Sequence, residues 1–146
     1  MPVDTDMRIL VVDDFAAARK IVINSLAQLG FNNTDEADDG FSALVRLKSA
    51  LFDMVVIDWK MSKMSGMELL KQIRADPNLK HIPVLMVSDD DLQENIVAAT
   101  KAGLNAYIIR PFEVKTLQKN WKKFSSRIES SFFYPVDDRP VDILQG

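Results

Sequence analysis

Short apolar runs alternate along the chain with longer segments in which apolar residues recur every three or four positions. Four runs lie at residues 9–12, 54–57, 84–87 and 106–109. Runs of this length and composition are typical of strands buried on both faces of a parallel sheet. Residues 33–37 give a weak, polar strand signal that the pattern alone does not establish.

A helical pattern follows each strand. The predicted helices cover residues 17–29, 41–51, a segment from Ser65 that fades by Pro77, 92–102 and a final segment that ends near Ile128. Gly30 and Gly103 follow two of these helices as C-terminal stops. Ser65 and Glu68 have the spacing of a capping box. The predicted buried stripes are Ile21, Leu26 and Leu29 in the first helix, and Val114, Leu117, Trp121, Phe124 and Ile128 in the last.

Strict alternation of strands and helices predicts an α/β fold, a doubly wound parallel sheet of five strands with helices on both faces. The pattern breaks after residue 129, where prolines and acidic residues interrupt it. We therefore expect one domain over residues 1–129 and a C-terminal tail over residues 130–146.

Composition narrows the possible functions. The 146 residues include 47% hydrophobic residues, enough for a single domain with a core. The net charge of −3 argues against nucleic acid or an anionic membrane as a partner. There is no cysteine for disulfide or thiolate chemistry, no apolar run of membrane-spanning length and no signal-peptide pattern at the start. A cytoplasmic location is expected.

Polar residues terminate each strong strand. They are Asp13 and Asp14, Asp58, Ser88 and Arg110. Because ligands bind beyond the carboxyl ends of the strands in open parallel sheets, these side chains should meet at one place. Taken singly, each has a simpler explanation, such as capping a helix, ending a turn or lying on the surface. Their conjunction favours a functional site.

Three neighbouring carboxylates repel one another unless a hard cation lies among them, and Mg²⁺ prefers oxygen ligands of this kind. One carboxylate can then attack phosphorus, as in aspartyl-phosphate chemistry. Ser88 and Arg110 would contact the phosphoryl oxygens. The strand ends therefore predict a magnesium-dependent phosphoryl site.

Several stretches around these residues resemble the response-regulator receiver domain family and, within it, the chemotaxis regulators of the CheY type. The stretches are 10–15 (LVVDDF), 29–33 (LGFNN), 58–61 (DWKM), 66–71 (GMELLK), 83–88 (PVLMVS) and 107–112 (YIIRPF). The similarity runs from about residue 8 to residue 128. It implies a flavodoxin-like sheet with strand order 2-1-3-4-5.

The resemblance also implies roles for individual residues. Asp58 would be the phosphoacceptor, and Asp13, Asp14, Asp58 and the backbone carbonyl of Lys60 would hold Mg²⁺. Ser88 and Tyr107 occupy the family's two switch positions. The peptide bond before the residue equivalent to Pro111 is cis in the family.

Four departures from the family pattern stand out. Arg110 replaces a lysine, Ser62 replaces a usual proline, and Lys60 lies where access of the hydrolytic water is tuned. The fourth helix begins with the acidic segment 89–93 in place of lysines, and Asn120 replaces another lysine. The last change weakens the case for an acidic flagellar-switch partner.

The resemblance implies a monomeric response regulator for chemotaxis and flagellar motor control. Its partners would be a CheA-like histidine kinase and either the flagellar motor switch protein or a phosphatase. Such a protein is a phosphoacceptor with weak autophosphatase activity, not an enzyme in the usual sense. Alternatives are a phosphate sink or regulator of a non-motor partner, and an adaptor that works without phosphorylation. A phosphohydrolase with an aspartate nucleophile is disfavoured, because Lys60 stands where its second aspartate is needed.

Overall fold

The sheet of this protein has five parallel strands in the order β2-β1-β3-β4-β5. The computed structural model describes residues 5–118. The strands are β1 (Ile9–Val12), β2 (Thr34–Ala37), β3 (Met54–Asp58), β4 (Val84–Ser88) and β5 (Ala106–Ile109). Both the fold class and the strand order predicted from the sequence are confirmed.

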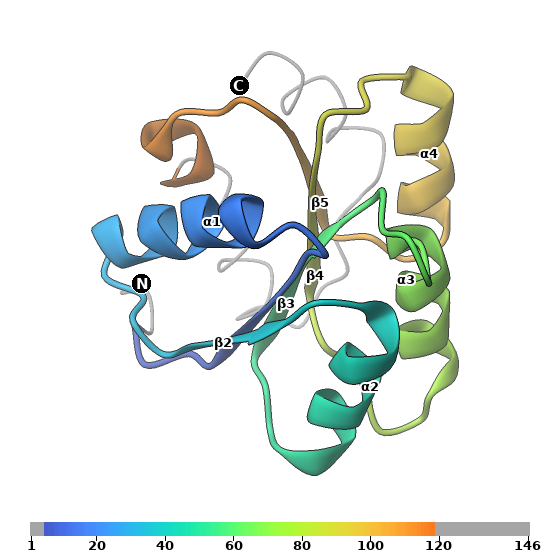
Figure 1. Cartoon of the computed structure of the whole chain (residues 1–146). Helices are drawn as coiled ribbons and strands as arrows, with labels where there is room; N and C mark the ends of the chain where they lie inside the picture. Colours follow the sequence, from blue (N-terminus) through green and yellow to red (C-terminus); the bar gives the residue numbers. More distant parts are fainter. Residues whose placement is uncertain (1–4, 119–146) are drawn as a thin grey trace.

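Helices cover both faces of this sheet (Figure 1). They are α1 (Ala16–Gln28), α2 (Gly40–Ser49), α3 (Gly66–Ala75) and α4 (Gln93–Lys101), and residues 114–118 are also helical. In Figure 1, α1 and the helical segment 114–118 lie on one side of the sheet, and α2, α3 and α4 lie on the other. No helix within residues 5–118 has both the length and the apolar character needed to cross a bilayer.

Strands β1, β3 and β4 form the centre of the core, and all of their residues are buried. The edge strand β2 is different, since three of its four residues are only half-buried. Its acidic side chains are paired: Arg8 contacts Asp35 at 2.7 Å, and Arg19 contacts Glu36 at 2.8 Å. An edge strand covered by ion pairs needs few apolar residues, which explains its weak sequence signal.

The buried face of α1 matches the predicted stripe at two of its three residues. Leu26 is buried and Leu29 packs against the core, but Ile21 is 57% exposed and Val22 is buried in its place. Ser25 also lies on the buried side, and its hydroxyl donates a hydrogen bond to the carbonyl oxygen of Ile21 at 2.8 Å. Because this hydrogen bond lets a polar residue be buried, the apolar pattern alone did not identify the whole buried face of α1.

The predicted helix ends are confirmed. Ser65 Oγ accepts from the amide of Glu68, whose side chain accepts from the amide of Ser65, so the capping box is complete. Gly30 and Gly103 have φ angles of 96° and 110°, in the left-handed region that favours glycine.

Part of the predicted final helix lies outside the described residues. Leu117 is buried, as its stripe predicts. Trp121, Phe124, Ile128 and the predicted tail all fall after residue 118, as does the predicted boundary at residue 129.

An added methyl group should lower the free energy of unfolding by different amounts at Gly66 and Gly40, the first residues of α3 and α2. A Cβ on Gly66 would lie 2.3 Å from the backbone oxygen of Asp58, whereas a Cβ on Gly40 would meet only the Met64 side chain, at 2.5 Å from its sulfur. We expect Gly66→Ala to lower the free energy of unfolding by about 1–3 kcal/mol. Gly40→Ala should cost clearly less, because a side chain moves more easily than a main chain. Equilibrium denaturation of both variants checks this, and equal costs would contradict it.

Candidate functional site

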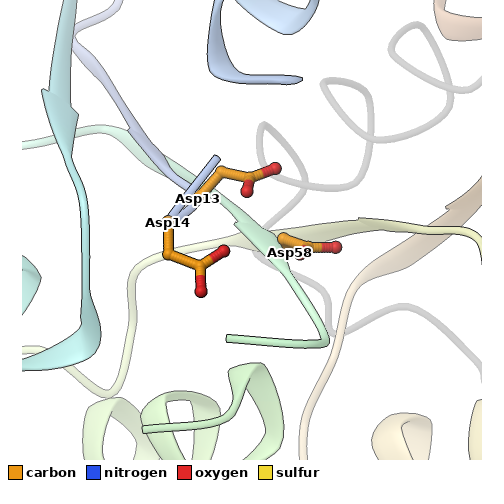
Figure 2. A group of neighbouring side chains, drawn as sticks. All are labelled: Asp13, Asp14 and Asp58. Atoms are coloured by element: carbon orange, nitrogen blue, oxygen red, sulfur yellow. The ribbon is translucent and has the colours of Figure 1, made fainter. Parts of the chain in front are cut away.

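The parallel register of the sheet brings the predicted polar residues to one edge. Val12 pairs with Ile57, Asp58 with Val87, and Ser88 with Ile109, so the ends of the central strands are nearly level. Asp13 and Asp14 continue directly from β1, and Asp58 is the last residue of β3. Figure 2 shows their three side chains gathered at this edge.

The three carboxylates form a compact acidic cluster. Each offers one oxygen atom, and these atoms lie within 4.8 Å of one another. Asp13 and Asp58 are buried, whereas Asp14 is exposed. Hard oxygen donors at this spacing fit a divalent cation such as Mg²⁺. Lys60, whose backbone carbonyl the resemblance assigns to the metal, lines the same cavity of about 620 Å³.

Backbone amides hold the carboxylates in place. Asp13 Oδ1 accepts from the amide of Phe15 at 2.9 Å. Asp14 Oδ2 accepts from the amide of Ser62 at 2.9 Å. The family's usual proline at this position has no N–H to donate, so Ser62 adds a hydrogen bond between the β3–α3 loop and Asp14.

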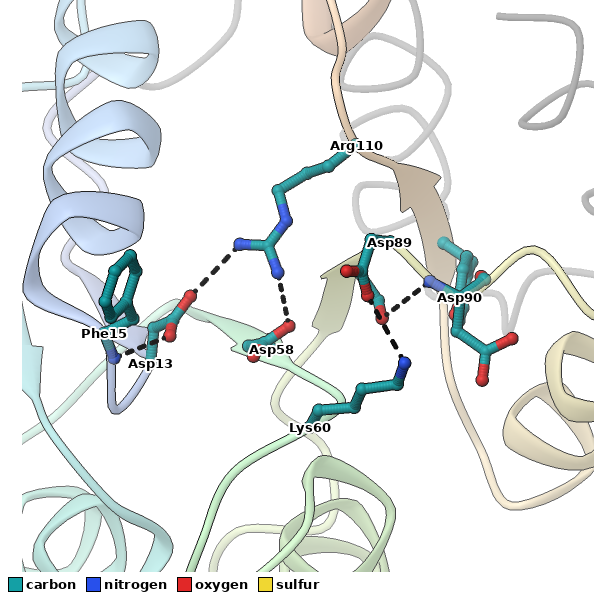
Figure 3. Close-up of polar contacts among 9 residues, drawn as sticks. Asp13, Phe15, Asp58, Lys60, Asp89, Asp90 and Arg110 are labelled. Carbon is teal, nitrogen blue, oxygen red and sulfur yellow. Dashed lines mark hydrogen bonds and ion pairs between the residues drawn. The ribbon is translucent and has the colours of Figure 1, made fainter.

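Arg110 supplies the positive charge of the site. Its Nη1 atom lies 3.2 Å from Asp13 Oδ2, and its Nη2 atom lies 2.8 Å from Asp58 Oδ1 (Figure 3). The guanidinium group therefore bridges carboxylates that follow two neighbouring strands. Each carboxylate accepts one charge-assisted hydrogen bond, which is stronger than a hydrogen bond between neutral groups.

Burial and crowding make ionisation of Asp58 costly. Burial of the carboxyl group raises the pKa of Asp58 to about 6, and the negative charges of Asp13 and Asp14 add to that rise. Arg110 and the backbone amide of Trp59 act in the opposite direction. One guanidinium group thus only partly offsets the mutual repulsion of the acidic cluster.

Ser88 and Tyr107 lie at the same sheet edge and are connected to each other through Asp90. The Ser88 hydroxyl oxygen accepts from the amide of Asp90 at 3.2 Å, and Tyr107 Oη donates to the carbonyl oxygen of Asp90 at 2.7 Å. Tyr107 is buried, and its burial raises the pKa of the phenol to about 12. Ser88 does not line the acidic cavity, unlike Asp58 and Arg110.

Asp90 is the residue that sequence reasoning missed. Its carboxylate accepts from the amide of Leu92 at 2.9 Å and from the side chain of Asn95 at 2.7 Å. Asp90 therefore joins both switch positions to the start of α4. The sequence signal was the acidic segment before this helix, which had been interpreted through its charge, as favourable for a helix N-terminus and unfavourable for an acidic partner.

A further ion pair lies at the rim of the site, and a cis peptide bond follows β5. Lys60 Nζ lies 3.7 Å from Asp89 Oδ1, between the loops that follow β3 and β4 (Figure 3). Both side chains are about two-thirds exposed, at 66% and 65%, so the pair adds little stability. The peptide bond between Arg110 and Pro111 is cis, as the resemblance implied.

Comparison with known families decides what kind of domain carries this site. The sequence profile of the response regulator receiver domain matches residues 9–122. The chain belongs to the response regulator receiver domain family. This match confirms the family predicted from the sequence, and receiver domains are in general signalling phosphoacceptors instead of classical enzymes.

Two curated relatives of this receiver domain are chemotaxis proteins. It is 52% identical to chemotaxis protein CheY-3 of Vibrio cholerae over 123 residues, which cover 84% of this chain and 95% of the relative. It is 47% identical to chemotaxis protein CheY of Pseudomonas aeruginosa over 122 residues, which cover 84% of this chain and 98% of the relative.

Solved structures agree with this assignment. Chemotaxis protein CheY4 of Vibrio cholerae superposes with a TM-score of 0.75 at 28% identity, covering 82% of this chain and 98% of that chain. A putative response regulator from Chloroflexus aurantiacus gives a TM-score of 0.78 at 27% identity, covering 84% and 99% of the two chains. The receiver domain described here is therefore a CheY-like chemotaxis response regulator receiver domain.

The raised pKa of Asp58 predicts how stability depends on pH. The folded-state pKa of about 6 exceeds the ordinary value of 3.8, so the folded state binds the proton more tightly. Proton binding by Asp58 therefore stabilises the folded state. Its contribution to the free energy of unfolding is complete below about pH 4 and is lost as the pH rises through about 6. Without divalent cations, Asp58→Asn should raise the free energy of unfolding at neutral pH by about 1–3 kcal/mol.

Chemical denaturation between about pH 4 and pH 8 measures this effect. The advantage of Asp58→Asn over the wild type should shrink steadily as the pH falls. The exposed Asp91 provides a matched control, and Asp91→Asn should show little such dependence. A stability difference that stays constant across the range would refute the assigned pKa shift.

Proposed function

We propose that Asp58 accepts a phosphoryl group from a CheA-like histidine kinase, and that the protein signals in chemotaxis through phosphorylation-dependent protein contact. The observation that carries this proposal is the position of Asp58. Its carboxylate ends β3 inside the acidic cavity, next to Asp13 and Asp14 and 2.8 Å from Arg110. The chemotaxis function of the curated relatives supports the biological context.

In this proposal a carboxylate oxygen of Asp58 attacks phosphorus. A phosphorus–oxygen bond forms, the phosphorus–nitrogen bond of the phosphohistidine breaks, and the imidazole keeps the electron pair. The acyl phosphate carries more negative charge than the carboxylate from which it forms, and Asp58 is already buried beside two other carboxylates. Its formation therefore depends on added positive charge in the cluster. Attack of water on the acyl phosphate would restore the carboxylate, and this is the weak autophosphatase activity that we expect.

The metal would be held by Asp13, Asp14, Asp58 and the backbone carbonyl of Lys60. When bound, Mg²⁺ supplies positive charge that neutralises the phosphoryl oxygens. Arg110 contributes a second positive charge, 2.8 Å from Asp58. Phosphoryl transfer depends mainly on such positioning and charge stabilisation.

Ser88 is the proposed link to the output. Its hydroxyl oxygen accepts from the amide of Asp90, and a bond to a phosphoryl oxygen would require this hydroxyl to turn toward Asp58. Asp90 would then lose one of the contacts that fix it to Ser88 and Tyr107. Because Asp90 also binds Leu92 and Asn95, the change would reach the start of α4.

One observation favours the phosphate sink, or a non-motor partner, as a second candidate. Asp89, Asp91 and Glu94 are all exposed at the start of α4. An acidic motor-switch peptide would be repelled by this surface. The adaptor alternative is weaker, because all three carboxylates of the phosphoryl site are present and clustered.

The phosphoacceptor role is tested by incubating the protein with phosphoramidate and Mg²⁺ and recording its intact mass. We expect one added phosphoryl group in the wild type and in the surface control Asp91→Asn. Asp58→Asn should gain none, and chelation of the metal should abolish the reaction of the wild type. Equal labelling of Asp58→Asn would show that another residue is the acceptor.

Binding of a motor-switch peptide separates the two candidate functions. With beryllofluoride and Mg²⁺ bound, the protein should bind the peptide, and Asp91→Lys should tighten binding several-fold by removing a repulsive charge. Asp38→Lys makes the same charge change beyond the other edge of the sheet and should have little effect. Calorimetry that detects no binding by any of these proteins would leave the phosphate sink as the better account.

A further inference from the structure

The peptide unit between Asp13 and Asp14 joins two of the three carboxylate residues of the site. Because a peptide unit is planar, its orientation helps to set the directions in which the two flanking side chains leave the backbone. The unit lies between the end of β1 at Val12 and the start of α1 at Ala16, outside both regular elements. The directions of these two carboxylates therefore depend on the contacts that hold this turn.

Arg19 holds the oxygen atom of that peptide unit. Its Nη1 atom donates a hydrogen bond to the carbonyl oxygen of Asp13 at 2.7 Å. Its Nε atom donates to Oε1 of Glu36, on β2, at 2.8 Å. The amide of Asp13 donates to the carbonyl oxygen of Ala37 at 3.2 Å. The backbone of Asp13 is thus fixed from α1 and from the edge strand at once.

The place of Arg19 in its helix offers no advantage to a cation. Arg19 is the fourth residue of α1, near the positive N-terminal end of the helix dipole, where a positive side chain is unfavourable. Its side chain is only 16% exposed, so the guanidinium group also loses hydration. The benefit of this arginine therefore lies in the contacts that it makes outside α1, to Asp13 and Glu36.

Position and charge give Arg19 opposite effects on metal binding. A guanidinium group beside the acidic cluster repels a divalent cation, so by charge alone its removal would tighten the binding of a metal. Loss of its bond to the Asp13 carbonyl has the reverse effect, because a less restrained turn presents the two carboxylates to the cation in more orientations. The sign of the change in metal affinity distinguishes the two effects.

We propose that Arg19, tied to Glu36, is a positioning residue that fixes the peptide unit between Asp13 and Asp14 and so preorganises the carboxylates for a divalent cation. Partners that orient metal ligands typically contribute about 10–100-fold to metal affinity. Arg19 acts here through the backbone of Asp13, to which it donates, and not through a carboxylate of the cluster. This inference rests on the proposed metal-binding role of the three carboxylates.

The test measures Mg²⁺ affinity by isothermal titration calorimetry in the wild type, Arg19→Met, Arg19→Lys and the control Lys20→Met. Methionine keeps much of the apolar length of arginine but has no donor, so Arg19→Met should bind Mg²⁺ about tenfold more weakly. Lysine keeps the charge but lacks the planar fork that reaches two partners, so Arg19→Lys should bind it several-fold more weakly. Lys20→Met removes the same charge from the neighbouring exposed position and should not weaken binding.

Circular dichroism at the titration temperature establishes that each variant is folded. If Arg19 had only a structural role, its loss would lower the free energy of unfolding and leave the Mg²⁺ dissociation constant unchanged. A folded Arg19→Met that binds Mg²⁺ at least as tightly as the wild type therefore overturns the positioning role, as does an equal loss of affinity in Lys20→Met. Where Arg19→Met does not fold, the same criterion applies to Arg19→Lys.

The outcomes also separate this inference from the proposed function. If the positioning role fails while Asp58 still gains a phosphoryl group by intact mass, the phosphoacceptor role stands. If the wild type binds no Mg²⁺ and gains no phosphoryl group, both proposals fail.

Discussion

The mutual repulsion of the three carboxylates is the constraint on which the site depends. Asp13 and Asp58 lie in the protein interior, where an unpaired charge is costly. Arg110 bridges them, yet the pKa of Asp58 still rises to about 6. The cluster is therefore short of positive charge. A divalent cation among the oxygens would supply it, and an incoming phosphoryl group would then meet a balanced site.

The sheet fixes the backbone positions from which these side chains extend. Asp58 ends a strand that is buried throughout, with β1 on one side and β4 on the other. Gly66 at the start of α3 packs directly against the backbone of Asp58 and donates its amide to the carbonyl of Trp59 at 2.8 Å. The rigid sheet therefore maintains a charge arrangement that isolated side chains would avoid.

The same edge of the sheet also carries the link from site to surface. Ser88 ends β4 and Tyr107 lies in β5, and both bind the backbone of Asp90. Asp90 in turn fixes the start of α4. A contiguous chain of hydrogen bonds therefore connects Ser88 and Tyr107 to the start of α4.

Much of this could be predicted because it depends on local sequence and parallel topology. The apolar runs located β1, β3, β4 and β5, and the residues that end them located the acidic cluster and Arg110. The sequence pattern was weak for β2, where ion pairs replace apolar packing. In α1 it was right for Leu26 and Leu29 but wrong for Ile21, because the buried side also includes a serine that is satisfied within its own helix.

Contacts that depend on side-chain rotamers could not be predicted from the sequence. The bridge from Arg110 to Asp13 joins residues 97 positions apart. The bond from Tyr107 to Asp90 depends on which way a buried phenol points. Both required the fold before they could be seen.

A crystal structure of the protein with Mg²⁺ and beryllofluoride tests the phosphoryl site most directly. We expect beryllium bound to a carboxylate oxygen of Asp58, the metal held by Asp13, Asp14 and Asp58, and the guanidinium of Arg110 turned toward the fluorides. Beryllofluoride on any other residue, or a metal bound away from the three carboxylates, would contradict this expectation.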